Sequence, residues 1–226
     1  MPLILGTNSI KDTGYNVANS LRFNRASSDY LSQTISSSTG KTITLSFWMK
    51  KSTEESNMGI FHLSSDNNGS HYIEIATKSS HGLDIQFLNG SGSTFLRRRT
   101  NRLLRDFSAW MNVVIRFDST QASASNRFRL YINGVQETDL DVNSTPDVPQ
   151  DYVTDFNTNG SVLNIGRNVT DNHYYHGYLC EYVLVDGSSL DPTSFGEFDA
   201  DTNIWKPIDV SGLTFGTNGF YLDFEN

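Results

Sequence analysis

The chain has 226 residues and a formal net charge of −8, and hydrophobic residues make up 37% of it. Its 14 Phe, 10 Tyr and 3 Trp carry large apolar surfaces, so we expect a sizeable core despite the modest apolar fraction. The negative charge disfavours general nucleic-acid binding, because phosphates carry the same sign. The sequence has neither the roughly 20 consecutive apolar residues of a membrane span nor the basic lead and apolar run of a secretory signal. We therefore expect no membrane span, no signal peptide and synthesis in a cytoplasm.

Short runs rich in β-branched and aromatic residues recur along the chain, separated by clusters of Gly, Asn, Asp and Ser. In the first long run, Ile43, Leu45 and Phe47 occupy alternate positions, which places them on one face of a strand. In chain order, the clearest predicted strands are Lys41–Lys51, Gly59–Leu63, His71–Thr77, Leu83–Leu88, Trp110–Asp118, Arg127–Val135, Val162–Gly166, Gly177–Val185 and Gly219–Phe224. The pattern predicts an all-β fold.

Turn and helix signals complete the predicted organisation. Asn133–Gly134 between two strand-forming runs is a strong signal for a two-residue hairpin. Helical signals are scarce; one short helix is predicted over Pro192–Phe198, with Asp191 as its N-cap and proline in its first turn. The polar segments 119–126 and 143–160 are predicted to be surface loops. Because no interdomain linker is evident, we expect residues 1–226 to form one domain.

The order of the motifs resembles that of a known superfamily. The motifs that carry this resemblance are Ser20–Phe23, Asp29–Leu31, Thr44–Met49, Trp110–Val114, Leu130–Gly134, Leu163–Arg167 and Gly177–Leu184. They are similar to the opening strands, central hairpin and closing strands of laminin G-like and pentraxin-like domains. The resemblance implies a concanavalin A-like (laminin G-like) jelly-roll β-sandwich, with its core at about residues 20–198, an N-terminal arm at 1–19 and a C-terminal extension at 199–226.

The flanks resemble a narrower group. Residues 1–24 and 194–224 are similar to laminin G-like modules in virion proteins of tailed bacteriophages. This resemblance implies a virion structural protein, such as a capsid decoration, fibre-head or tail component, that displays a lectin-like jelly roll and attaches to host surface glycans. The expected partners are other virion proteins, further copies of the chain in a homo-oligomer and a host glycan, and the expected location is the virion. A free-standing carbohydrate-binding lectin is the alternative, and a glycan-cleaving enzyme is a third.

The Asp and Glu residues of the sequence lack the arrangement that glycan cleavage needs. Some members of the superfamily are glucanases, which need two carboxylates flanking the sugar bond. The predicted strands around Glu74 and Asp84 offer one acid each, and the acidic segment 197–201 follows the predicted helix in a polar turn. Cys180 is the single cysteine and is expected to be a buried strand residue. We therefore expect no catalytic residues and no enzymatic activity.

The resemblance also implies a candidate calcium site. Pentraxin-like domains hold calcium through two loops, and calcium takes about six to eight oxygen ligands. The matching positions are Asp66 and Asn67 in one loop and Asn168 and Asp171 in the other. Only two of these residues are carboxylates, and the alternative is that all four are ordinary turn formers. No other cofactor is expected.

The segment 172–176 contains the candidate glycan-binding residues His173, Tyr174 and Tyr175. Their amphipathic rings in a polar loop are suited to stacking on the face of a sugar. The alternative is that this segment already belongs to the next strand, with Tyr174 or Tyr175 packed inside.

A basic cluster stands out in this acidic chain, formed by Arg97, Arg98 and Arg99 together with Arg102. Guanidinium groups form forked hydrogen bonds with carboxylates, so these residues are candidates for contact with an acidic neighbouring subunit or an anionic polysaccharide. The alternative is a solvated strand and loop, because charge runs usually face water.

Overall fold

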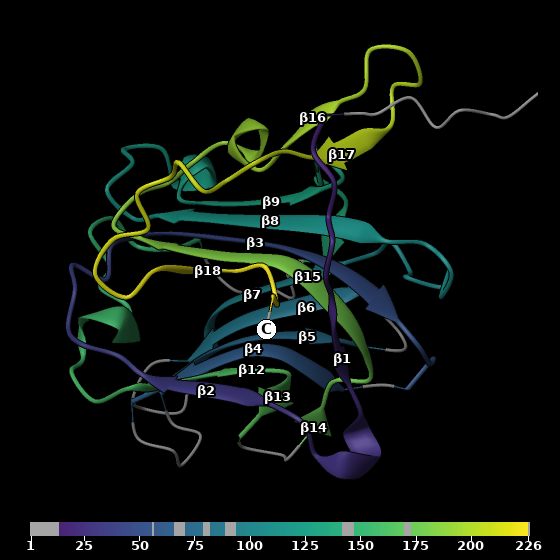
Figure 1. Cartoon of the computed structure of the whole chain (residues 1–226). Coiled ribbons are helices and arrows are strands. Elements are labelled where there is room, and N and C mark those ends of the chain that lie inside the picture. Colours follow the sequence, from purple (N-terminus) through teal and green to yellow (C-terminus); the bar gives the residue numbers. More distant parts are fainter. Residues whose placement is uncertain are drawn as a thin grey trace, which may run out of the picture.

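The computed structural model describes residues 14–55, 57–65, 71–78, 82–88, 94–141, 147–169 and 173–225. Two large antiparallel sheets are stacked face to face, as Figure 1 shows. The predicted all-β class is confirmed, because the helical segments of these residues are 3₁₀ turns of three residues each. Within the same residues, no helix is long and apolar enough to cross a membrane.

Sheet A has seven strands, in the order β1, β15, β3, β8, β9 and β10, with β18 also paired to β15. Their bounds are Leu21–Phe23 (β1), Thr42–Lys51 (β3), Met111–Asp118 (β8), Phe128–Ile132 (β9), Val135–Gln136 (β10), Gly177–Asp186 (β15) and Phe220–Leu222 (β18). Asn133 and Gly134 join β9 to β10 with φ angles of 48° and 75°. Positive φ at both positions is the requirement of a type I′ turn, so the predicted hairpin is confirmed.

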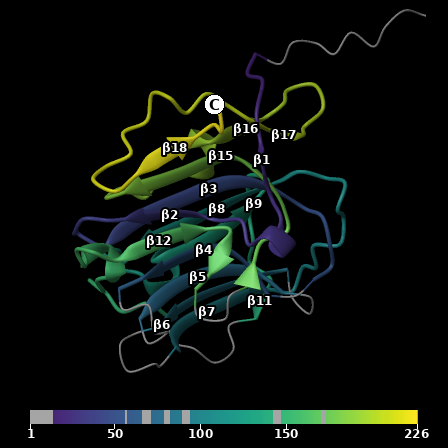
Figure 2. The ribbon, with the colours of Figure 1, turned by 60° about the horizontal axis from the view of Figure 1, so that its bottom comes forward.

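Sheet B also has seven strands, in the order β11, β7, β6, β5, β4, β12 and β2, which can be followed in Figure 2. Their bounds are Leu31–Thr34 (β2), Met58–Ser64 (β4), Tyr72–Thr77 (β5), Leu83–Leu88 (β6), Thr94–Thr100 (β7), Leu140–Asp141 (β11) and Val162–Ile165 (β12). All the pairings are antiparallel. Consecutive strands β4 to β7 lie side by side, so they form a meander.

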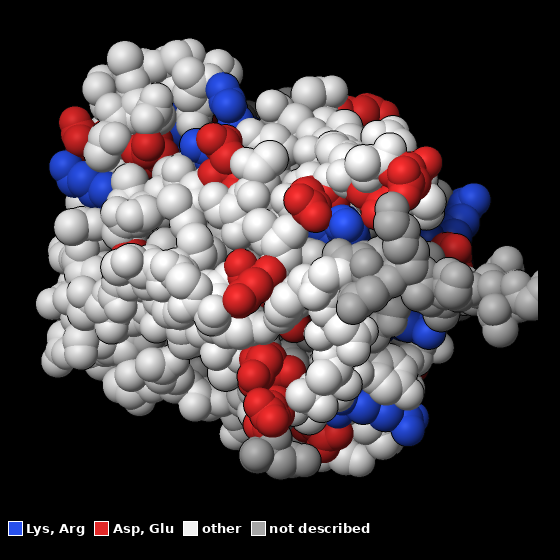
Figure 3. All heavy atoms as spheres, turned by 45° about the horizontal axis from the view of Figure 1, so that its top comes forward, with Lys and Arg blue, Asp and Glu red and all other residues white. Residues whose placement is uncertain are grey.

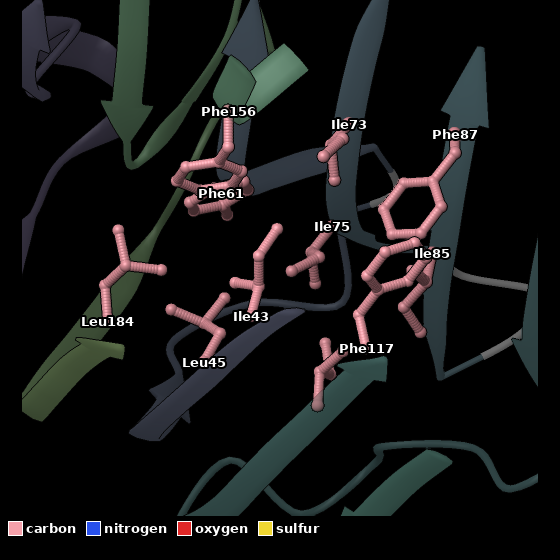
Figure 4. Close-up of a pocket in the computed structure, with 11 residues that line it drawn as sticks. Ile43, Leu45, Phe61, Ile73, Ile75, Ile85, Phe87, Phe117, Phe156 and Leu184 are labelled. Carbon is pink, nitrogen blue, oxygen red and sulfur yellow. The ribbon is translucent and has the colours of Figure 1, made fainter. Parts of the chain in front are cut away.

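The main core fills the space between the two sheets. As predicted, Ile43, Leu45 and Phe47 of β3 point inward and are buried. They meet the inward side chains of sheet B, and at their meeting point lies a cavity of about 30 Å³ (Figure 4). The cavity is lined by Ile43, Leu45, Phe61, Ile73, Ile75, Ile85, Phe87, Ile115, Phe117, Phe156 and Leu184. Because these side chains offer no hydrogen-bond partner to a water molecule, we expect the cavity to be dry.

The C-terminal segment covers the outer face of sheet A and adds a third layer (Figure 1). Within it, β16 (Gly196–Phe198) pairs with β17 (Trp205–Pro207). The indole N–H of Trp205 donates to Oδ1 of Asn112, a fully buried residue of β8, over 3.0 Å. The same ring packs on Gly134, where a Cβ atom would lie only 2.3 Å from it. Trp205 therefore anchors the segment to the sheet.

The burial of outward-facing residues follows from this layer. Val114, Val183 and Val185 lie on the outer face of sheet A and form a second hydrophobic cluster with Phe195 and Val210 of the C-terminal segment. A sandwich whose outer faces were in water would carry polar residues at such positions. Sheet A is therefore a central layer, buried on both faces over much of its area.

Two local predictions have different outcomes. The helix predicted over Pro192–Phe198 is wrong in length: only Pro192–Ser194 form a 3₁₀ turn, and the next residues form β16. Asp191 makes no capping hydrogen bond, because its carboxylate pairs with Arg116. Cys180 is buried on β15, as predicted, and burial raises the pKa of its thiol to about 12.

Candidate functional site

The outer face of sheet B carries a row of polar side chains from neighbouring strands. Strand alternation sends Ile73 and Ile75 of β5 into the core and Glu74 to the outside. On β6, Gln86 lies opposite Glu74, and Asp84, two positions before Gln86, likewise faces outward. Glu74 and Asp84 are only 6% and 2% exposed. Buried carboxylates need compensating partners, and arginines and an asparagine provide them here.

Asp84 is held by two arginines of β7. Arg97 donates from Nε and Nη2 to the two carboxylate oxygens over 3.0 and 2.6 Å, which is a forked ion pair. Arg99, which lies opposite Asp84 in the register, donates from Nε over 3.2 Å. The hydrogen bond with Asp84 raises the pKa of Arg97, and Glu74 adds to the attraction. The network fixes the charged side chains of this face in place.

A small hairpin lies on the same face. It consists of β13 (Arg167–Asn168) and β14 (His173–Tyr174) and packs against β4. Asn168 is buried, and its Nδ2 donates to Oε1 of Glu74 over 2.6 Å. The close approach depends on Gly59 of β4, because a Cβ there would lie 2.4 Å from the backbone nitrogen of Asn168. The hairpin and the polar row are therefore one continuous structure.

The candidate calcium ligands are only partly covered by the structure. Asp66, Asn67 and Asp171 lie outside the described residues. Asn168 does lie within them, and its amide is committed to Glu74 inside the protein. Among the residues that the structure describes, no group of three His, Cys, Asp or Glu side chains is arranged to hold a metal ion. Calcium binding stays a prediction that rests on Asp66, Asn67 and Asp171.

Two tyrosines and an arginine form the accessible part of the site. The guanidinium of Arg167 lies 4.8 Å from the ring centroid of Tyr30 and 5.6 Å from that of Tyr174. The two rings are 6.3 Å apart and tilted by 49°. Tyr30 is 44% exposed, and Tyr174 is half-buried. Cation–π contacts at these distances hold the rings at the surface.

Tyr30 is a site residue that no pattern in the sequence indicated. The pairing of β2 with β12 sets Leu31 opposite Ile165, so Tyr30 comes next to the start of the β13–β14 hairpin. No local pattern in the sequence contains that register. The contact with Arg167 was therefore accessible only from the fold.

The predicted glycan-binding residues divide between surface and core. Tyr174 is at the surface and His173 is half-buried. Tyr175 is fully buried and packs edge-on against Phe23 of β1 at 6.1 Å between centroids. For Tyr175 the alternative interpretation therefore holds, because strand alternation turns it into the core, where no sugar can reach it.

The basic cluster is largely engaged within the chain. Arg97 and Arg99 hold Asp84, as described above. Arg98 is 6% exposed and pairs with Asp147 over 2.7 Å. Arg102 pairs with Glu137 over 2.8 Å, and its side chain keeps 56% of its surface exposed. Contact with a partner stays a prediction, and Arg102 is the member best placed to make it.

The two buried carboxylates described on this face are both held by hydrogen bonds. Both oxygens of Asp84 accept hydrogen bonds from guanidinium groups, and Glu74 accepts one from Asn168. The acidic segment 197–201 begins in β16 and continues into a turn, where Asp199 accepts from Thr202, and these hydrogen bonds lower the pKa of Asp199 to about 2. A glycosidase needs one carboxyl group that carries a proton to the sugar.

Sheet A carries a separate cluster of one carboxylate and two tyrosines. Glu181 sits at a β-bulge of β15 with a φ of 47°, and its Oε2 accepts from Tyr221 at 2.7 Å and Tyr15 at 2.9 Å. Burial raises the pKa of Glu181. Figure 3 shows the face that includes the top of Figure 1, where acidic side chains form small groups, several of them beside basic side chains. The cluster links the segment before β1 to the last strand.

The chain is similar to a known protein family in sequence and to solved structures in fold. A family profile described as "Concanavalin A-like lectin/glucanases superfamily" (Laminin_G_3) matches residues 25–190. Among curated proteins, no sequence matches this chain.

Similar solved structures include domains LG4-5 of the mouse laminin alpha1 chain, with a TM-score of 0.52, 16% identity and coverage of 92% of this chain and 48% of that one. A putative carbohydrate binding protein from Bacteroides ovatus has a TM-score of 0.51 and 14% identity, with coverage of 88% and 56%. The native heptameric SAP-like pentraxin from Limulus polyphemus has a TM-score of 0.48 and 16% identity, with coverage of 71% and 70%. This chain thus spans about half the length of the laminin fragment and of the Bacteroides protein, and at these identities the likeness concerns the fold.

Proposed function

Because this chain belongs to the concanavalin A-like lectin/glucanases superfamily, we propose that it is a non-catalytic glycan-binding module of a bacteriophage virion. The observation that carries the binding proposal is the accessible pair Tyr30 and Tyr174 around Arg167. Tyrosine rings stack on the apolar face of a sugar, and a guanidinium offers several N–H donors to its hydroxyl groups. The hydrogen bond from Asn168 to Glu74 fixes the hairpin that carries Tyr174 to sheet B.

Calcium is part of the proposal as an ion bound by the candidate ligands of the two loops. With Asn168 committed to Glu74, the ligands are Asp66, Asn67 and Asp171. So few oxygens hold calcium weakly, since tight sites supply six or more. A rise in the thermal unfolding midpoint with millimolar CaCl₂ that disappears in Asp66→Asn supports the ion, and equal midpoints in CaCl₂ and EDTA argue against it.

The virion assignment is supported by the resemblance of residues 1–24 and 194–224 to phage laminin G-like modules. The C-terminal stretch of that resemblance supplies the layer over sheet A, which leaves the face with Tyr30 and Tyr174 uncovered by it. In this proposal the other virion proteins and further copies of the chain are the partners, and multiple copies raise the avidity for a host surface glycan.

A glycan array with purified protein, with and without calcium, tests the binding proposal. We expect Tyr30→Ala and Tyr174→Ala each to weaken the binding of a positive glycan about three- to ten-fold, as expected for loss of one stacking ring. Phe198→Ala is the matched control, because Phe198 is an equally exposed aromatic residue (45%) on β16. Binding that is absent in both conditions, or that survives both tyrosine substitutions, contradicts the proposal.

Two further measurements address the remaining parts. Quantitative mass spectrometry of purified phage particles tests the virion assignment: hundreds of copies indicate a capsid decoration, a handful indicates a tail or fibre, and absence from the particle contradicts it. A reducing-sugar assay on capsular polysaccharides tests the non-catalytic part, and sustained turnover by the pure protein contradicts it.

A further inference from the structure

A second pocket lies at one end of the sandwich. It has a volume of about 250 Å³ and is formed by the end of β3, the start of β8, the end of β9 and the loop 102–110. Met49 and Met111, which face each other across β3 and β8, form its floor together with Ile132. Trp110 lies in its wall and packs edge-on against Tyr178 at 6.4 Å. The pocket is smaller than the roughly 300–1,000 Å³ of drug-sized sites, so it suits a small ligand.

Lys51 gives this pocket its chemistry. Strand alternation places Lys51 in the same inward row as Phe47 and Met49, at the edge of the core. Only 5% of the residue is exposed. Its Nζ donates to the carbonyl oxygen of Leu104 over 3.0 Å and lies 5.4 Å from the ring centroid of Phe107. An ammonium group has three N–H donors, and among the described residues Lys51 has this one hydrogen bond and no carboxylate partner.

The burial of Lys51 is costly without an anion. Burial lowers the pKa of Lys51, and only the exposed Glu54 opposes the shift through its charge. A buried ammonium group with unused donors is stabilised when a negative group reaches it. The buried ammonium group of Lys51 therefore favours an anionic ligand.

The other charged groups of the pocket also favour a negatively charged ligand. Arg105 is exposed and, among the described residues, forms no hydrogen bond or ion pair. Arg102 is neutralised by Glu137. Asp106 is the one carboxylate of the lining, and its Oδ1 accepts from the backbone and hydroxyl of Ser108. Two cations that form no ion pair with the described residues thus share the pocket with one carboxylate that is already hydrogen-bonded.

We propose that this pocket binds the carboxylate of an acidic sugar, of the uronic acid class, with Lys51 and Arg105 as the anion-binding residues and Trp110 as the wall for the sugar ring. A single pyranose ring covers the apolar wall, whereas the side chain of an Asp or Glu residue leaves most of it in water. The choice of a sugar over an acidic peptide rests on the proposed function; the anion site itself does not.

Titration with D-glucuronate, followed by tryptophan fluorescence, tests the site, with D-glucose as the neutral probe. We expect a saturable signal with glucuronate alone, which is lost in Trp110→Phe because Trp110 is the reporter. Lys51→Met should weaken binding about ten-fold or more, because it removes a buried hydrogen bond to a charged group. Arg105→Gln, at an exposed position that cannot endanger folding, should weaken it about two- to five-fold. Lys41→Met is the matched control, because Lys41 lies just before the opposite end of β3, and it should leave binding unchanged.

The outcomes separate this site from the proposed function. Tyr174→Ala should reduce binding on the glycan array and leave the glucuronate titration unchanged. Equal responses to glucose and glucuronate, or unchanged affinity in both Lys51→Met and Arg105→Gln, overturn the anion site. Tighter binding of a short polyglutamate peptide than of a glucuronate oligosaccharide, competing for the same Trp110 signal, overturns the assignment to a sugar.

Discussion

The replacement Trp205→Phe tests whether the C-terminal segment is an integral layer of the fold. The indole N–H of Trp205 is the donor that satisfies Oδ1 of Asn112, whose residue is fully buried in β8. Phenylalanine keeps most of the ring and removes that donor, which leaves a buried acceptor unsatisfied at a cost of about 1–3 kcal/mol. The smaller ring also leaves a cavity against Gly134 and Gly196, for about 1 kcal/mol more. We expect the free energy of unfolding to fall by about 2–4 kcal/mol.

Urea unfolding followed by far-ultraviolet circular dichroism measures this loss without depending on tryptophan emission. Trp110→Phe is the matched control, because Trp110 is half-buried and its ring lines a pocket. Its replacement should cost less than half as much. Limited proteolysis gives a second measure, since a weakened anchor should expose residues 199–225 to cleavage before the sandwich unfolds.

The expectation for Trp205 has a clear counter-result. A loss below about 1 kcal/mol, on the scale of ordinary surface substitutions, together with an unchanged proteolysis pattern, would mean that the segment is a loose cover. The layer over sheet A would then contribute little to stability, and the burial of Val114, Val183 and Val185 would have to be explained without it.

Three further predictions concern buried groups. Tyr175→Phe should leave stability unchanged or raise it by up to about 1–2 kcal/mol, because the buried Tyr175 hydroxyl has no hydrogen-bond partner among the described residues; calorimetric midpoints check this, and a lower midpoint contradicts it. Burial raises the pKa of Glu181 above its ordinary value of 4.5, so the folded state holds the proton more tightly. The stabilisation of the folded state by protonated Glu181 is complete below the pKa of the unfolded chain. It is lost as the pH rises through the pKa of the folded protein. Glu181→Gln cannot titrate, so its urea midpoint relative to the wild type should rise between pH 4 and pH 8; a constant difference refutes the shift. The Cys180 thiol, with a pKa of about 12, should resist a disulfide reagent at pH 8 in the folded protein and react after unfolding; rapid labelling of the folded protein contradicts its burial.

The elements set by local periodicity could be predicted from the sequence. The alternation of Ile43, Leu45 and Phe47 and the Asn133–Gly134 turn each depend on residues close in the chain, and the structure confirms both. The helix over Pro192–Phe198 failed because a proline and an acidic cap are compatible with a single 3₁₀ turn, and the following residues pair with β17 instead.

The candidate site depended on register, which local patterns do not contain. The arginines of β7 had the composition of a solvated patch, and only their pairing with β6 shows that two of them form ion pairs with Asp84. Tyr30 and Tyr174 meet because β2 is paired with β12. Lys51 had the appearance of a strand-end lysine in the sequence, and its burial depends on the loop that follows β7.

The edges of the two sheets have a consequence for the protein at high local concentration. The outermost strands are short: β10 and β11 have two residues each, β1 and β18 three, and β2 four. Long, flat edges act as templates on which the sheets of neighbouring molecules join into aggregates. Edges of this length offer few backbone groups to a neighbour, so many copies can be crowded together while each sandwich stays a separate particle.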